Sequence, residues 1–173
     1  EQFPSLNILV NNAGIQHRYD FLNDEDALKK INEEIDINFK AAVSLTRIFL
    51  PILAKASEAA IINVSSFLGI VPKSSAPIYC ATKAALHSFS KSLRFQLQGT
   101  TVKVFDIITP LVDTDMTRGY MDDAGKMSPE TLAREVIRSI KKDNYEIKPG
   151  KTRLALFLNR VAPSLIQRIM EKR

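Results

Sequence analysis

The 173-residue sequence contains a single cysteine, no tryptophan and no apolar run long enough to cross a bilayer, which takes about 20 residues. The single Cys80 excludes an internal disulfide and suits a reducing compartment, so we expect a cytoplasmic protein. The sequence also shows no signal-peptide pattern. Its net charge of +5 is modest and includes no dense basic patch, so we expect no nucleic-acid partner.

The sequence does contain enough apolar residues for one core. They make up 45% of the chain, which predicts a single domain over residues 1–173. Short apolar runs bounded by polar residues suit parallel strands that are covered on both faces. The expected strands are residues 6–10, 59–64, 102–108 and 145–147, and the expected helices are residues 24–56, residues 78–98 and one that begins at Ser128.

The pair Tyr79 and Lys83 is the first candidate for chemistry. The two residues stand four positions apart in a helical pattern, so both side chains should project from one face. A free tyrosine has a pKa of about 10 and transfers protons poorly at neutral pH. A neighbouring ammonium favours the phenolate and lowers that pKa. The pair is therefore a candidate proton-transfer device, although the spacing alone also suits a helix that carries both residues by chance.

Three more polar motifs lie at expected strand ends or on a helix. The sequence N-N-A-G at residues 11–14 follows the first strand, and its glycine lets a ligand approach the backbone closely. Ser65 and Ser66 end the second strand, where a hydroxyl can donate to a carbonyl oxygen. Asn38 lies within the first long helix. Taken alone, each motif also has an ordinary explanation as a turn or as a solvent-facing side chain.

The order N-N-A-G, helix Asn, strand-S-S-x-x-G and Y-x-x-x-K resembles the ordinary branch of the short-chain dehydrogenase/reductase family. Four motifs in register extend this resemblance over the whole chain. It implies a Rossmann-like α/β fold with a doubly wound parallel sheet. It also implies an enzyme that transfers hydride between NAD or NADP and a small carbonyl or alcohol substrate. From residue 102 onward the sequence is also similar to bacterial oxidoreductases of the DltE type, a narrower resemblance that implies no substrate.

The resemblance implies roles for four catalytic residues. Tyr79 would donate or accept the proton, and Lys83 would lower the pKa of Tyr79 and hold the nicotinamide ribose. Ser66, selected over Ser65 by the family spacing, would polarise the carbonyl. Asn38 would be buried, bend its helix and seat a water in a proton relay. The residues implied to line the cofactor are Asn11, Ala13, Gly14, Val112 and Thr114, together with Tyr79 and Lys83, and no metal site is implied.

Two departures from the family pattern affect these expectations. Members usually have P-G-x-V-x-T after the strand at residues 102–108, whereas this chain has Thr109 and Pro110 in place of Pro-Gly, which leaves the turn geometry open. The loop T-G-x-x-x-G-x-G that holds the cofactor pyrophosphate is absent. We therefore expect the carboxyl-terminal portion of a Rossmann domain, from the fourth strand onward, which is inactive by itself. Residues 116–127 would form a substrate lid.

Assembly and alternative functions are the remaining expectations. In this family, the helices at residues 24–56 and 78–98 pair across a two-fold axis, which implies a homodimer or homotetramer. The absent glycine loop also suits a non-catalytic interaction fragment. A sugar-nucleotide epimerase of the extended branch is disfavoured by N-N-A-G and by the short region after Thr114.

Three features have ordinary interpretations. The tail at residues 154–173 has the pattern of a basic amphipathic helix, which can lie on an anionic membrane but more often packs on its own subunit or on a partner. We interpret His17 and Tyr19 as surface residues of a polar loop. We interpret His87 as a packing residue of its helix.

Overall fold

The computed structural model describes residues 5–18, 20–119 and 125–171. Within these ranges, the chain forms a parallel sheet of four strands in the order β1-β2-β3-β4. The strands are β1 (Ile8–Asn11), β2 (Ala59–Ser66), β3 (Val102–Thr109) and β4 (Glu146–Ile147). This arrangement confirms the predicted α/β fold with a parallel sheet.

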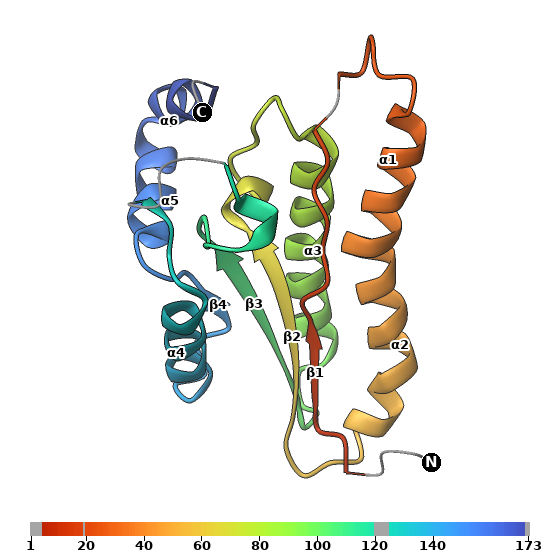
Figure 1. The fold of residues 1–173 in the computed structure, drawn as a ribbon. Helices are drawn as coiled ribbons and strands as arrows, with labels where there is room; N and C mark the ends of the chain where they lie inside the picture. The colour runs from red at the N-terminus through yellow and green to blue at the C-terminus, as the bar shows by residue number, and fades with distance from the viewer. Residues whose placement is uncertain (1–4, 19, 120–124, 172–173) are drawn as a thin grey trace.

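Helices cover both faces of the sheet (Figure 1). On one face they are α1 (Ala27–Ile35), the π-helical turn η1 (Asp36–Lys40), α2 (Ala41–Leu53) and α3 (Pro77–Gln96). On the other side they are α4 (Pro129–Ile140), α5 (Thr152–Val161) and α6 (Pro163–Glu171). Two short 3-10 turns, η2 (Phe67–Gly69) and η3 (Asp115–Thr117), follow β2 and β3.

Each face of the sheet has its own apolar core. The cluster beside α2 and α3 consists of Leu53, Ala59, Ile61, Leu93, Val102 and Val104. The cluster beside α4 consists of Ile62, Phe105, Ile107 and Ile147, with Leu132, Val136 and Ile140 packed against it. Successive strand residues point to opposite faces, so one buried run supplies both clusters. Burial of each large side chain contributes about 1.5–3 kcal/mol, which makes the sheet a rigid support for its polar carboxyl edge.

Local sequence signals explain where two helices begin. The Ser128 Oγ accepts a hydrogen bond from Thr131 N at 3.2 Å, and Pro129 takes the first helical position, which confirms the predicted start of α4. Pro77 begins α3 in the same way. Gly99, the predicted end signal of α3, lies just past the helix in a turn with a φ of +83°.

The structure corrects two predicted helices. The helix expected over residues 24–56 begins at Ala27 and contains the π-helical turn η1. The tail, expected to be one amphipathic helix, forms two, because Pro163 lacks a backbone N–H and disfavours a helical conformation at Ala162. No helix in the described ranges is long and apolar enough to cross a bilayer.

Gly69, the glycine of S-S-x-x-G, determines how closely η2 packs on α3. A Cβ added at Gly69 would lie 2.7 Å from the backbone C of Lys83 and 2.8 Å from the backbone N of Ala84. Because these contacts are backbone atoms, η2 would have to move away from α3. We expect Gly69→Ala to lower the free energy of unfolding by about 1–3 kcal/mol in urea denaturation.

Gly99 provides the matched control. Its surroundings are open, but its φ of +83° disfavours side chains. At Gly99, asparagine should be tolerated better than alanine, because asparagine adopts left-handed backbone more readily. At Gly69, asparagine should destabilise more than alanine, because it is larger. The same ranking of the two residues at both positions would contradict the packing explanation.

Candidate functional site

The α3 helix places Tyr79 and Lys83 together in a buried position. The Tyr79 residue is 8% exposed and Lys83 is 4% exposed. The Lys83 Nζ lies 5.7 Å from the centroid of the Tyr79 ring, and it donates a hydrogen bond to the Val64 carbonyl at 2.7 Å. The helix thus presents both side chains to the end of β2, as the four-residue spacing predicts.

Burial changes the acidity of Lys83. Removal from water lowers the pKa of Lys83 from 10.5 to about 8, and the Asp106 carboxylate acts in the opposite direction. The buried side chain therefore exchanges its proton much closer to neutral pH than an exposed lysine does. Such a pKa suits a group that must stabilise a phenolate at working pH.

Asn38 connects the first loop to α3. It is 1% exposed and lies in the π-helical turn η1. Its Nδ2 donates to the Ile15 carbonyl at 2.9 Å and to Thr82 Oγ1 at 3.2 Å, while its Oδ1 accepts from Ile15 N at 2.8 Å. The expected burial of Asn38 and the local departure from α-helical geometry are both present. The extra residue of a π turn re-aims a side chain, and such turns are frequent at functional sites.

The N-N-A-G loop lies close to the side chains of Lys83 and Asn38. A Cβ added at Gly14 would lie 3.3 Å from Lys83 Nζ and 3.4 Å from Asn38 Oδ1. Glycine is therefore the residue that lets this loop pass so close to the ammonium. Ala13 is exposed in the same loop. The structure thus brings Gly14, Asn38, Tyr79 and Lys83 to one site.

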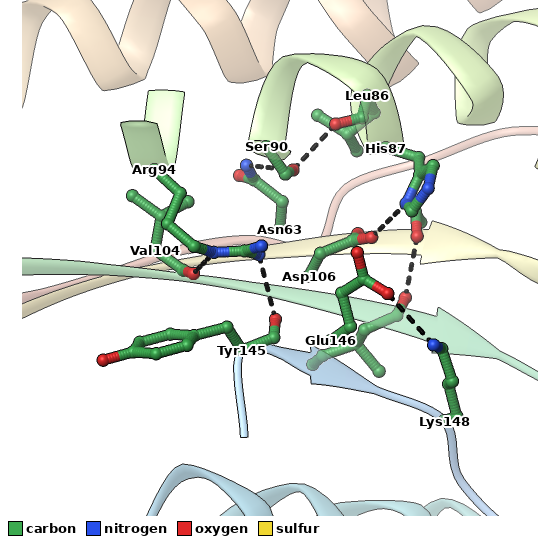
Figure 2. A network of polar contacts seen from close by, with 12 residues as sticks. Asn63, Leu86, His87, Ser90, Arg94, Val104, Asp106, Tyr145, Glu146 and Lys148 are labelled. Atoms are coloured by element: carbon green, nitrogen blue, oxygen red, sulfur yellow. Dashed lines mark hydrogen bonds and ion pairs between the residues drawn. The ribbon is translucent and has the colours of Figure 1, made fainter. Parts of the chain in front are cut away.

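The Asn11 side chain has a different position from the one that cofactor binding suggests. Its Nδ2 donates to Asn63 Oδ1 at 2.7 Å and to Thr46 Oγ1 at 3.2 Å. Asn63 in turn donates to Ser90 Oγ at 2.8 Å, and Ser90 donates to the Leu86 carbonyl (Figure 2). This buried chain of hydrogen bonds ties β1, β2 and α3 together, so the Asn11 side chain has a structural role.

The two serines of S-S-x-x-G have different surroundings. The Ser65 Oγ donates to the Ile107 carbonyl at 3.1 Å and so links β2 to β3. The Ser66 Oγ accepts from Leu68 N at 3.1 Å, and within the described ranges its own proton has no acceptor. Of these two serines, Ser66 is therefore the one whose hydroxyl proton is not engaged, and its catalytic role stays a prediction.

The loop after β3 begins with a contact that sequence reasoning missed. The Thr109 Oγ1 donates to the Ser65 carbonyl at 2.9 Å, so threonine in place of the usual proline stays in the sheet and bonds to β2. Val112 and Thr114 follow at the carboxyl end of β3, and the Thr117 Oγ1 donates to the Val112 carbonyl at 2.6 Å. Because Thr109 pairs with Ser66 in the register of β2 and β3, this loop starts at the carboxyl edge of the sheet, and η3 follows β3 there (Figure 1).

Several other expectations concern loops and side chains around the site. Met127, the end of the expected lid, donates its backbone N–H to the Leu111 carbonyl at 2.9 Å, while residues 120–124 lie outside the described ranges. Tyr19 also lies outside these ranges. The partly buried His17 bonds to Glu33 through Nε2 at 3.1 Å. The interpretation of His87 as a packing residue was wrong, because its Nδ1 lies 2.5 Å from Asp106 Oδ2.

Comparisons with known proteins agree with this geometry. A family model described as short chain dehydrogenase matches residues 1–125. The chain is 42% identical over 151 residues to the uncharacterized oxidoreductase DltE of Bacillus subtilis (strain 168), a match that covers 85% of this chain and 60% of that protein. It is 31% identical over 137 residues to the very-long-chain 3-oxoacyl-CoA reductase of Homo sapiens, covering 78% of this chain and 44% of that protein.

A solved structure shows the same fold. A short chain dehydrogenase from Burkholderia cenocepacia J2315, in complex with NADP, has a TM-score of 0.86 to this chain at 22% identity, covering 98% of this chain and 70% of that one. Fold and site together define an α/β protein with a Rossmann-like parallel sheet and a buried Tyr–Lys pair at its carboxyl edge. The chain belongs to the short-chain dehydrogenase family, which confirms the resemblance drawn from the motifs. It spans less than two thirds of the length of these two curated relatives.

Lys83 should make stability depend on pH in a defined window. Its pKa is about 8 in the folded chain against an ordinary value of 10.5, so the unfolded chain binds more protons at this residue between those values. Stability therefore rises with pH across the window, and the full cost of the buried ammonium is present below about pH 8. Between pH 8 and 10.5, the free energy of unfolding of the wild type should therefore rise by about 3 kcal/mol relative to that of Lys83→Met.

The control for this measurement is Lys91→Met, which removes an exposed lysine from the same helix. Urea denaturation of the three proteins at several pH values gives the differences directly. The free energies of unfolding of wild type and Lys91→Met should differ by a nearly constant amount across these pH values. A constant difference between wild type and Lys83→Met would show that the Lys83 ammonium is not buried at a cost.

Proposed function

We propose that this chain carries the catalytic residues of an NAD- or NADP-dependent oxidoreductase that interconverts a small carbonyl compound and its alcohol. The observation that carries the proposal is the buried Lys83 ammonium beside Tyr79, with 5.7 Å between Nζ and the ring centroid. The pair lies at the carboxyl edge of the sheet, where ligands of parallel α/β sheets bind. Solved relatives hold NADP or NAD, which supports a nicotinamide cofactor.

The residues around Lys83 fit the nicotinamide half of such a cofactor. One of the three ammonium donors bonds to the Val64 carbonyl, and no other described residue accepts from it, so donors remain for ribose hydroxyls. Gly14 keeps the approach to the ammonium free of a side chain. The residues that would hold this half are Ala13, Gly14, Tyr79, Lys83, Val112 and Thr114, whereas the Asn11 side chain bonds within the protein and would contribute only through its backbone. When bound, the cofactor supplies or accepts the hydride.

The chain's own residues handle the proton. In the direction of reduction, Tyr79 Oη gives its proton to the substrate oxygen as the carbonyl becomes an alcohol. The Lys83 ammonium stabilises the phenolate that forms. The Ser66 hydroxyl, which accepts from Leu68 N, donates to the same substrate oxygen and stabilises its developing charge. Asn38 fixes the loop at Ile15 against α3 and seats the water that returns a proton.

We also propose that the chain forms the carboxyl-terminal part of a Rossmann-like domain and acts together with a glycine-rich segment that holds the pyrophosphate. The 60% coverage of DltE supports this. So does β1, an edge strand of the described sheet whose Ile8 and Val10 are half exposed. The buried, unpaired Cys80 suits the cytoplasm. Oxidoreductase relatives favour hydride transfer over sugar-nucleotide epimerisation.

Removal of one hydroxyl tests the proposal. In the full-length protein, Tyr79→Phe should lower carbonyl reduction by about 10²–10⁴-fold, because the proton donor is lost while the ring still packs. The assay is NADPH or NADH consumption with a panel of aldehydes and ketones. The control is Tyr145→Phe, which makes the same change just before β4, away from the site. Near-normal activity of Tyr79→Phe would overturn the acid–base role, and a wild type inactive on every carbonyl would favour a non-catalytic interaction fragment.

We propose that the protein is a homodimer or homotetramer that forms through α2 and α3. Both helices expose large apolar side chains: Ile48 is 62% exposed and Phe95 is 66% exposed. Exposed apolar surface of this kind marks an association face. Light scattering should show at least a dimer at protein concentrations of tens of micromolar, and Ile48→Glu should weaken this self-association. Phe157→Glu on α5, which changes a similarly exposed residue elsewhere, should not, and a wild-type monomer would contradict the proposal.

A further inference from the structure

His87 lies one helical turn beyond Lys83 and contacts a buried carboxylate of the sheet. Tyr79, Lys83 and His87 follow one another at four-residue intervals on α3, so their side chains leave the same face of the helix. The His87 Nδ1 lies 2.5 Å from Oδ2 of Asp106 in β3, and the Asp106 side chain is 0% exposed (Figure 2). The face of α3 that carries Tyr79 and Lys83 therefore continues to His87, which contacts a buried carboxylate.

The contacts of this carboxylate are incomplete. The Asp106 Oδ1 is buried and has no hydrogen-bond partner in the described ranges, although buried carboxylates are usually fully bonded. In the sheet, Asp106 pairs with Asn63, the residue before Val64, whose carbonyl accepts from Lys83. Lys83 itself forms no salt bridge with a described residue. The register thus places an incompletely bonded carboxylate next to the strand segment whose carbonyl accepts from the Lys83 ammonium.

We propose that Asp106, held by His87, is a positioning residue whose negative charge keeps Lys83 in its ammonium form. The catalytic meaning of this inference rests on the proposed function, because Tyr79 needs the ammonium to stabilise its phenolate. The Asp106 carboxylate touches neither substrate nor cofactor. It acts through Lys83, across the interface between α3 and the sheet.

The other charged groups of the region are exposed or engaged elsewhere. They are Lys91 and Arg94 of α3, Glu146 and Lys148 at β4, and Glu34 of α1. Glu146 lies opposite Asp106 in the register of β3 and β4, but its carboxylate forms an ion pair with Lys148 at 3.0 Å. Arg94 donates to two backbone carbonyls, at 2.9 Å and 3.1 Å. Glu34 accepts from the backbone of the first loop at 2.7 Å. None of the described residues of β2 or η2 carries a charge.

The electrostatics of Lys83 agree with this geometry. Burial lowers the pKa of Lys83, and the charge of Asp106 is the influence that opposes it. The interaction between two buried charges is strong, because little water screens it. Without the Asp106 charge, only the unfavourable effect of burial remains, so Lys83 should lose its proton at a lower pH.

Titration of Lys83 itself tests the inference. The Cε signal of Lys83 in protein labelled with ¹³C-lysine, assigned by its loss in Lys83→Met, gives the titration midpoint by NMR. In Asp106→Asn, which removes the charge and keeps the shape, the midpoint should fall by about half a pH unit or more. In Glu146→Gln, the matched removal of a neighbouring charge, it should stay within about a tenth of a unit of the wild type.

A second variant covers the case in which Asp106→Asn fails to fold. The double variant Asp106→Asn with His87→Gln replaces the contact between His87 and Asp106 by two amides that can bond to each other, and it should show the same fall. An unchanged midpoint in either folded variant, or an equal fall in Glu146→Gln, would overturn the inference. The readout does not depend on turnover. An inactive wild type with the expected shift would reject the proposed function and leave the link between Asp106 and Lys83 intact.

Discussion

The site depends on one constraint, which is the burial of the Lys83 ammonium where α3 meets the end of β2. An ammonium taken out of water costs several kcal/mol unless polar groups replace its hydration. The Val64 carbonyl supplies one such group at 2.7 Å. The close packing of α3 on this part of the chain requires glycine at position 69, where a Cβ would clash with the backbone of α3. The free energy that offsets this cost comes from the two apolar clusters on either side of the sheet.

Apolar and polar residues divide the sheet along its length. The amino-terminal parts of β2 and β3 supply core residues such as Ile61 and Val104, while buried polar residues gather toward the carboxyl ends. Ser65 bonds to β3, and Thr109 bonds back to β2. Because these side chains satisfy one another or the backbone, the polar half of the sheet remains closely packed. Ser66 and Lys83 can then present donors at a fixed place, which is the condition for positioned proton transfer.

Much of this arrangement could be predicted from the sequence, because its signals are local. The four-residue spacing of Tyr79 and Lys83 fixes a common helix face, and Ser128 with Pro129 fixes a helix start. The π-helical turn at Asn38 has no comparable signal, since it arises from contacts with residues far away in sequence.

The structural role of Asn11 and the pairing of His87 with Asp106 also could not be predicted. Each joins residues that meet only after helices pack on the sheet, although an aspartate in a buried strand was a signal that a partner existed. The break in the tail did have a local signal, Pro163.

The most direct measurement of the central claim is calorimetric titration of the full-length protein and its Lys83→Met variant with NAD and NADP. We expect the wild type to bind one of the cofactors and Lys83→Met to bind it about tenfold more weakly or worse. Equal affinity of the two proteins, or no binding at millimolar cofactor, would contradict the claim that the buried ammonium faces a nicotinamide cofactor.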